Sequence, residues 1–462
     1  MKPLVWINAV GLSPAQIGKR TPHLAALAAR GALAPMDPVL PAVTCSAQAT
    51  MLTGQPPSEH GIVGNGWYWS DLGEVLFWRQ PNRLVRGEKV YETLAKRNRG
   101  FTCAKLFWWW NMGARVDWSI TPRPYYPADG RKIPAVYGWP KSYPKTLEAE
   151  LGAFPFFDFW GPKSGLPSSR WLADATKLTL REHRPDLTMV YLPHLDYDHQ
   201  RFGPESPEGL RALEELDLLI GDLVTAAEAA GAATLVVSEY ALDSVRAPIA
   251  LNRELRRAGL LEVRETPGGE LLDPFGSRAF AVADHQLAHI YTQDEDARQA
   301  AREVVRSVDG VAALLEGDSR REAGLDHPNA GDLIALSERD RWFSYYYWLE
   351  DRAAPDFAPT VDIHRKPGYD PAELFVDPGL RLPAVRVARR LAQKRLGMRY
   401  LMDVIPLDGD QVRGSHGLAP RSPEHGPVFL CSEGWEACGG EPTAGRIPMT
   451  SVRDRVLKLV EG

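Results

Sequence analysis

The pattern of apolar and polar positions at the start of the chain predicts a strand followed by a helix. Residues 4–9 form an almost unbroken apolar run, which is typical of a strand that is covered on both faces of a parallel sheet. A helical pattern follows over residues 22–30. Thr21 can cap this helix, Pro22 suits its first position and Gly31 can end it.

The same order returns in the middle of the chain. An apolar run at 188–192 precedes a leucine-rich helical pattern at 210–230, and a second apolar run follows at 234–238. Strand, helix and strand in succession predict a right-handed parallel unit. We therefore expect the α/β class, with a mostly parallel central sheet and helices on both of its faces.

Residues 66–170 interrupt this pattern. Ten of the fourteen Trp residues lie between Trp67 and Trp171, nine of them in this segment, together with many Pro and Gly, and the periodicity is weak. We expect one domain over residues 1–462, with 66–170 as an aromatic-rich insertion over the sheet. The aromatic side chains can pack a loop-rich subdomain or offer a stacking surface to a planar ligand. Arg123, Asp129, Arg131 and Lys132 in the same segment would suit an anionic ligand.

Composition excludes several classes of protein. Apolar residues make up 44% of the chain and charged residues 24%, which is usual for a globular protein. The net charge of -5 provides no basic field for nucleic acid or anionic membrane. No stretch reaches the roughly 20 apolar residues of a membrane helix. Because the N-terminal run lacks a signal-peptide cleavage site, we expect a cytoplasmic protein.

The choice of metal ligands is also narrowed by composition. The chain has eleven His but only four Cys, at positions 45, 103, 431 and 438. These numbers argue against a disulfide framework and against a cysteine-based zinc module. If a metal is bound, carboxylates and histidines must hold it.

Thr44 is the strongest candidate for chemistry. It lies where an extended approach meets a predicted helix that Gly54 can close. Its hydroxyl would stand at a helix N-terminus, where free N–H groups favour anions, so it could attack phosphorus. The same position would also suit an ordinary N-cap.

The residues around Thr44 resemble a known family. Pro41 to Gly54 fits the pattern P-x-x-T followed by T-G, and the segment from Pro57 to Asn65 contains H-G-I and N. Both halves resemble the nucleophile block of the type I phosphodiesterase and nucleotide pyrophosphatase family of the alkaline phosphatase superfamily. The resemblance implies an alkaline-phosphatase-like core, with Thr44 as the nucleophile. It also implies that Asn65 helps to hold a phosphate oxygen.

Two later segments extend the resemblance. Tyr191 to Pro204 is similar to the family pattern Y-x-x-x-x-D-x-x-x-H-x-x-G-P, which places Asp196 at a zinc-ligand position. The segment Gly414-Ser415-His416-Gly417 is similar to G-x-H-G, whose histidine binds the same zinc in the family. Such residues converge because open α/β sheets place their sites at the C-terminal ends of strands.

The chain departs from the family at other ligand positions. Val10 stands where the family has an aspartate, and Gln200 stands where it has a histidine, although His199 is adjacent. The family's S-D-H-G reads Ser238-Glu239-Tyr240-Ala241. Glu239 can replace a carboxylate, but Val10 and Tyr240 cannot complete a dinuclear zinc site.

Two interpretations of the site remain open. In one, a single divalent metal, zinc by the resemblance, is held by Asp196, His416 and a substitute such as Glu239 or His199. One zinc still suffices as a Lewis acid. In the other, the site has lost its metals.

Other groups of charged residues and histidines could contribute. His364, Arg365 and Lys366 precede Tyr369 and Asp370, and cations beside a histidine suit phosphate or carboxylate. We expect these three residues to bind substrate. Asp284, His285 and His289 form a further group, in which the two histidines would share one face of a strand over 282–291.

The resemblance implies a hydrolase of phosphodiester or pyrophosphate bonds in a phosphorylated small molecule. A phosphomutase-type enzyme on the same fold is a variant of this hypothesis. The alternative from another class is a non-catalytic, substrate-binding protein of a small-molecule pathway.

Overall fold

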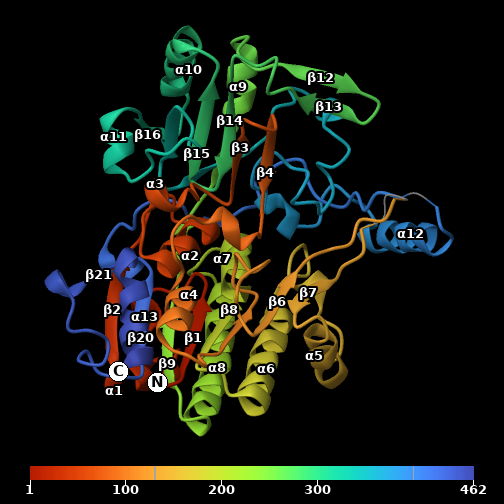
Figure 1. Cartoon of the computed structure of the whole chain (residues 1–462). Coiled ribbons are helices and arrows are strands. Elements are labelled where there is room, and N and C mark those ends of the chain that lie inside the picture. The colour runs from red at the N-terminus through yellow and green to blue at the C-terminus, as the bar shows by residue number, and fades with distance from the viewer. Residues whose placement is uncertain (129–131, 399) are drawn as a thin grey trace.

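The computed structural model describes residues 1–128, 132–398 and 400–462, and a nine-stranded sheet lies at its centre (Figure 1). The strands in spatial order are β21 (Ile447–Pro448), β2 (Ala32–Asp37), β20 (Val428–Cys431), β9 (Ala233–Val237), β1 (Leu4–Ala9), β8 (Leu187–Leu192), β5 (Cys103–Leu106), β6 (Trp118–Pro122) and β7 (Val136–Trp139). Neighbours from β9 to β6 pair in parallel, whereas β20 and β7 join antiparallel. The predicted α/β class and the mostly parallel sheet are confirmed.

Helices cover both faces of this sheet. In β1, Val5 and Ile7 pack into one apolar layer and Leu4 and Trp6 into the other. The first layer includes α1 (Pro22–Arg30), α5 (Tyr143–Leu151), α6 (Leu166–His183) and α8 (Pro207–Ala229). The second includes α2 (Thr44–Thr53), α4 (Val90–Arg97) and α13 (Val452–Glu461). Both faces of β1 are thus buried, as its unbroken apolar run predicts.

A smaller lobe lies beyond one end of the central sheet (Figure 1). Its antiparallel sheet has the order β14 (Ala279–Asp284), β15 (Leu287–Thr292), β17 (Leu333–Ser337) and β16 (Val311–Leu315). Around it lie α9 (Leu251–Arg257), α10 (Glu295–Ser307), α11 (Asp318–Glu322) and the hairpins β3 (Gly66–Trp69) with β4 (Glu74–Phe77) and β12 (Val263–Thr266) with β13 (Gly269–Leu272).

The single strand predicted over 282–291 is wrong. Residues 279–292 form a hairpin, and His285 lies in its turn with φ of 60°. His285 and His289 therefore do not share a strand face. The apolar run continues through both strands, so periodicity alone does not reveal the turn.

The predicted insertion over 66–170 is also wrong in part. The strands β5, β6 and β7 lie within this segment and extend the central sheet. Many of its aromatic residues are core residues, among them Trp108 and Trp110, which are fully buried. Asp129 and Arg131, which we expected near an anionic ligand, lie outside the described residues.

Short elements complete the fold. They are the two-residue strands β10 (Asp243–Ser244) and β19 (Gly414–Ser415), the pair β11 (Ala247–Ile249) and β18 (Arg341–Phe343), and the helices α3 (Pro57–His60), α7 (His194–Phe202) and α12 (Pro383–Arg395). Across the part of the chain that the structure describes, no helix is long and apolar enough to cross a membrane.

Lys105 gives a stability prediction for the core. It lies fully buried in β5, where its Nζ donates to the Trp110 carbonyl at 2.9 Å, and burial lowers the pKa of its ammonium to about 7. Between about pH 7 and 10.5 the unfolded chain binds more protons than the folded one, so this residue makes stability rise with pH. We expect Lys105→Met to lose that rise in urea unfolding curves. Lys177→Met, at a partly exposed position, is the control and should retain it.

Candidate active site

Thr44 is the first residue of α2, and it follows Val43, whose extended backbone ends the approach. Every residue of α2 is buried, and the helix ends at Gly54, whose φ of 73° suits glycine. The Thr44 hydroxyl lies 3.3 Å from the Tyr240 hydroxyl. The predicted placement of Thr44 at a helix N-terminus is confirmed, and this position favours a developing negative charge.

Asn65 lies beside Thr44 and is held by three hydrogen bonds. Its Oδ1 accepts from the backbone N–H of Cys45 at 3.0 Å. Its own N–H and its Nδ2 donate to the two carboxylate oxygens of Asp284, at 2.7 and 3.0 Å. Asp284 ends β14 of the smaller lobe, so this lobe fixes the side chain next to the candidate nucleophile. Burial raises the pKa of Asp284 to about 7, although the bonds from Asn65 oppose the shift.

Glu239 follows the C-terminal end of β9 and lies close to Thr44. Its Oε1 accepts two hydrogen bonds at 2.6 Å, from the side-chain amides of Asn8 and Gln48. Its Oε2 is buried and has no hydrogen-bond partner among the described residues. Burial raises the pKa of Glu239 to about 7, although the hydrogen bonds from Gln48 and Asn8 oppose the shift.

Asp196 and His416 also meet here. The Asp196 Oδ1 lies 3.9 Å from the His416 Nε2, and both atoms are buried without a hydrogen-bond partner within the described ranges. The His416 Nδ1 lies 2.7 Å from the Ala42 carbonyl, which assigns the proton to Nδ1 and leaves Nε2 as an acceptor. Burial lowers the pKa of His416 to about 3 and raises that of Asp196 to about 7.

Gln200 occupies the family's histidine position beside this pair. Its Nε2 donates to the Asp196 Oδ2 at 2.6 Å, and its Oε1 accepts from the Tyr369 hydroxyl at 2.7 Å. These two bonds fix the amide so that it presents N–H groups to Asp196. An N–H group cannot ligate a cation.

Four aromatic rings form a continuous stack beside Asp196. Tyr240 stacks on His416 with ring centroids 3.4 Å apart, His416 lies 3.6 Å from His285, and His285 lies 3.7 Å from Tyr369. All four side chains are buried. Two of these rings, Tyr240 and His416, occupy positions that supply metal ligands in the resembled family.

His199 lies outside this group. Its ring packs closely against Gly209 of α8. A side-chain Cβ added at Gly209 would lie only 3.1 Å from the His199 Cδ2, so the ring fills the space beside this glycine. The expectation that His199 completes a metal site is therefore wrong, because its side chain serves the packing of α7 against α8. Thr44, Asn65, Glu239, Asp196 and His416 come together as expected.

The side chains present do not fit a zinc ion. No group of three or more His, Cys, Asp or Glu side chains in residues 1–128, 132–398 and 400–462 is arranged to hold a metal. Burial raises the pKa of Tyr240 well above its usual range, so its phenol stays protonated. Asp196 and His416 supply two donor atoms, whereas zinc sites in proteins use three or four protein ligands.

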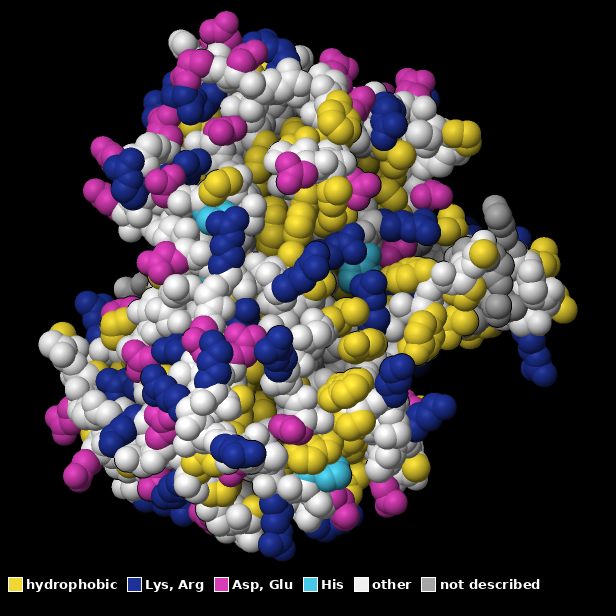
Figure 2. All heavy atoms as spheres, in the orientation of Figure 1, with side chains coloured by type: hydrophobic (Ala, Val, Ile, Leu, Met, Phe, Trp, Pro, Cys, Tyr) yellow, Lys and Arg dark blue, Asp and Glu magenta, His cyan; other side chains and the backbone are white. Residues whose placement is uncertain are grey.

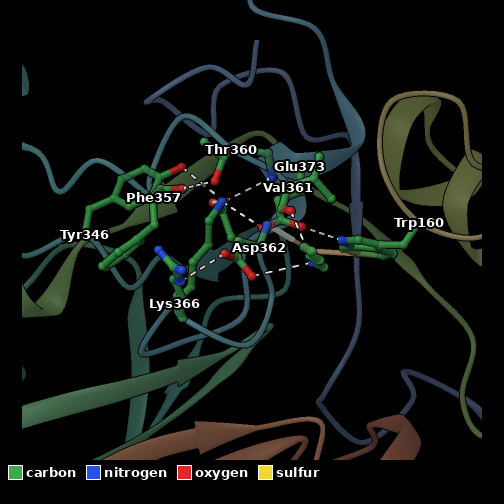
Figure 3. A network of polar contacts seen from close by, with 12 residues as sticks. Trp160, Tyr346, Phe357, Thr360, Val361, Asp362, Lys366 and Glu373 are labelled. Carbon is green, nitrogen blue, oxygen red and sulfur yellow. Dashed lines mark hydrogen bonds and ion pairs between the residues drawn. The ribbon is translucent and has the colours of Figure 1, made fainter. Parts of the chain in front are cut away.

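Lys366 is a structural cation, which corrects the expectation that it binds substrate. Its Nζ lies 2.6 Å from the Asp370 Oδ2 and 2.9 Å from the Glu373 Oε1, and the Trp160 indole N–H donates to the Glu373 Oε2 at 2.5 Å (Figure 3). The side chain of Lys366 is 1% exposed. His364 is partly buried and Arg365 is exposed, so these two remain accessible.

Sequence comparisons identify relatives of the chain. The model of the family "Type I phosphodiesterase / nucleotide pyrophosphatase" matches residues 4–370. A protein of Schizosaccharomyces pombe, described as an uncharacterized pyrophosphatase/phosphodiesterase, is 27% identical over 212 residues, which is 44% of this chain and 36% of the relative. The aligned region thus spans about a third of that relative.

Two solved structures share the fold over nearly the whole chain. Phosphonoacetate hydrolase of Sinorhizobium meliloti with phosphonoformate has a TM-score of 0.61 at 17% identity, covering 99% of this chain and 96% of that one. Murine ectonucleotide pyrophosphatase/phosphodiesterase 5 with AMP has a TM-score of 0.59 at 14% identity, covering 100% and 95%. At such identities the likeness establishes the fold, and it confirms the expected alkaline-phosphatase-like architecture.

Proposed function

The chain belongs to the type I phosphodiesterase/nucleotide pyrophosphatase family, and from this premise we propose that it hydrolyses a phosphodiester or pyrophosphate bond of a phosphorylated small molecule. The observation that carries the proposal is the Thr44 hydroxyl at the N-terminus of α2, beside Asn65 and Glu239. The ligands named for the two structural neighbours, AMP and phosphonoformate, are small phosphorus compounds and support the same substrate class.

Thr44 is the proposed nucleophile. Its Oγ attacks phosphorus, its proton passes to the free Oε2 of Glu239, and the bond from phosphorus to the leaving oxygen breaks as the new bond forms. The N-terminus of α2 and the Nδ2 of Asn65 stabilise the negative charge on the phosphoryl oxygens. Once the leaving group has departed, Glu239 releases its proton to solvent. It then accepts a proton from the water that attacks phosphorus, the bond from phosphorus to the Thr44 Oγ breaks, and Oγ regains a proton.

Asp196 is proposed to bind the phosphoryl group without a metal ion, whereas the Nε2 of His416 carries no proton and can only accept a hydrogen bond. Because burial raises its pKa to about 7, a fraction of Asp196 is protonated near neutral pH, and this form can donate a hydrogen bond to a phosphoryl oxygen. Since the donor set beside it does not fit zinc, no step depends on a metal. We further propose that the protein acts in the cytoplasm and has no nucleic-acid partner, in line with its net charge of -5.

A non-catalytic, substrate-binding protein is the second candidate. Two observations favour it: the family's usual metal ligands are replaced at Val10, Gln200 and Tyr240, and a ring stack fills the space beside Asp196. Such a protein would bind the phosphorylated molecule and release it unchanged.

Turnover by the purified wild-type protein tests the two candidates. We expect release of nitrophenolate from a nitrophenyl phosphodiester in preference to the matching phosphomonoester, and the same rate after treatment with a chelator. Absence of turnover with both esters would reject the hydrolase proposal. A rate that the chelator abolishes and zinc restores would instead show that Asp196 and His416 hold a metal.

A further inference from the structure

Three segments that lie far apart in the sequence meet at the surface near the candidate active site. The Gln80 Nε2 donates to the Pro122 carbonyl at 2.8 Å, which brings Arg79 close to Arg123. The backbone N–H of Arg123 donates to the Ala135 carbonyl at 2.9 Å, so residues 123–125 run beside 133–135.

The third segment is joined by ion pairs. The Lys132 Nζ lies 3.5 Å from the Asp362 Oδ1, and the Arg365 Nε lies 3.2 Å from the Asp362 Oδ2. His364 lies between the two residues of the second pair in the sequence. We call Arg79, Arg123, Lys132, His364 and Arg365 the basic surface cluster. It unites the two segments from which the sequence predicted contacts with an anion.

Among the described residues, the positive charges of this cluster are only partly balanced by carboxylates. Lys132 and Arg365 share a single carboxylate, that of Asp362. The Arg79 Nε and the His364 Nδ1 are buried and lack a hydrogen-bond partner among the residues described. Burial and the positive charge of Arg123 lower the pKa of Arg79 against the opposing effect of Glu74, and burial and nearby cations lower that of His364 to about 4 against that of Asp362. Positive groups that lie close together repel one another, and a bound anion would reduce that repulsion.

The position of the cluster links it to the candidate active site. Arg79 follows Trp78, whose backbone N–H donates to the Asn65 carbonyl at 2.9 Å. The Trp78 ring contacts Tyr369, the outermost ring of the stack, with centroids 6.0 Å apart. Figure 2 shows Lys and Arg side chains gathered around a histidine at the waist between the two lobes.

We propose that the basic surface cluster is a binding site for a phosphate group of a small ligand. A guanidinium group presents paired N–H donors that match the oxygens of phosphate, and Arg79 retains a free donor for this purpose. His364 adds a ring nitrogen, and Lys132 and Arg365 add charge. The proposed site does not include Thr44 and does not depend on hydrolysis there.

Calorimetric titration with inorganic pyrophosphate at low ionic strength tests the proposal. We expect the wild type to bind pyrophosphate, Arg79→Gln to weaken binding about tenfold, and the double variant Arg79→Gln/Arg123→Gln to weaken it further. Arg20→Gln removes the same charge from an exposed ion pair with Glu214 and should bind like the wild type. Thr44→Ala should also bind normally.

The same titration distinguishes failure of this proposal from failure of the proposed hydrolysis. Lack of binding by the wild type, or equal affinity in all arginine variants, would overturn the phosphate site whatever the turnover. Loss of binding in Thr44→Ala alone would place pyrophosphate at the nucleophile and would also overturn it. Should Arg79→Gln fail to fold by circular dichroism, the exposed Arg365→Gln provides the same comparison.

Discussion

Thr44→Ala is expected to lower the turnover of a nitrophenyl phosphodiester by about 10³-fold or more, because alanine lacks the hydroxyl that attacks phosphorus. The loss should appear in kcat, measured by steady-state release of nitrophenolate. Thr44→Ser is the matched variant, since it keeps the hydroxyl at the N-terminus of α2 and removes only a methyl group. We expect it to retain turnover within about tenfold of the wild type.

The result for Thr44→Ala is meaningful only if the variant folds. Thr44 is buried, and its hydroxyl lies near that of Tyr240, so a thermal unfolding curve should accompany the assay. Turnover that persists in a folded Thr44→Ala protein would exclude Thr44 as the nucleophile. Tyr240, whose hydroxyl is the nearest alternative, would then be the next residue to replace.

Asp284→Asn is expected to lower kcat by about 10²- to 10³-fold, the usual cost of losing one oriented donor to an oxyanion. The carboxylate of Asp284 accepts two hydrogen bonds from Asn65. An asparagine at position 284 would turn one of its two acceptors into a donor, so the amide of Asn65 would lose its fixed orientation beside Cys45. Asp284 is thus a positioning residue.

The split between kcat and KM distinguishes positioning from general damage. Asp332→Asn is the matched control, because Asp332 in the same lobe also accepts two hydrogen bonds at 2.8 Å, from the backbone and side chain of Thr292. We expect Asp332→Asn to leave kcat within about twofold of the wild type. Equal effects of the two variants on kcat would reject the positioning role of Asp284.

The elements that sequence patterns predict well are those with local signals. Helix α1 begins after Thr21 with Pro22 and ends before Gly31, and α2 ends at Gly54, so each boundary is encoded by residues next to it. Sequence patterns do not reveal strand β5, because Lys105 interrupts its short apolar run. That ammonium is buried by contacts with residues further along the chain.

The candidate site shows the same division. Family motifs predict Thr44, Asn65, Asp196 and His416, and the structure brings these residues together. His199 directly precedes Gln200 in α7. One residue along a helix rotates the side-chain direction by about 100°, so the His199 ring lies in the interface with α8 and not beside Asp196.

Contacts between distant residues account for the rest. The bond between Asn65 and Asp284 joins residues 219 positions apart, and no local pattern marks it. The role of Lys366 also depends on contacts that its immediate sequence does not reveal. Its neighbours in the sequence look suited to a ligand, but its ammonium forms ion pairs with Asp370 and Glu373.

The four-ring stack also has a mechanical consequence. His285 belongs to the hairpin turn of the smaller lobe, whereas its neighbour His416 is bonded to the Ala42 carbonyl in the approach to α2. Aromatic contacts of this kind contribute about 0.5–1.5 kcal/mol each beyond simple burial. A hinge motion that parted the lobes would separate these two rings and would pull the Asn65 Oδ1 from the backbone N–H of Cys45 in α2. These contacts therefore hold the two lobes together at the place where bond cleavage is proposed. An incoming molecule has to reach Thr44 without separating the lobes.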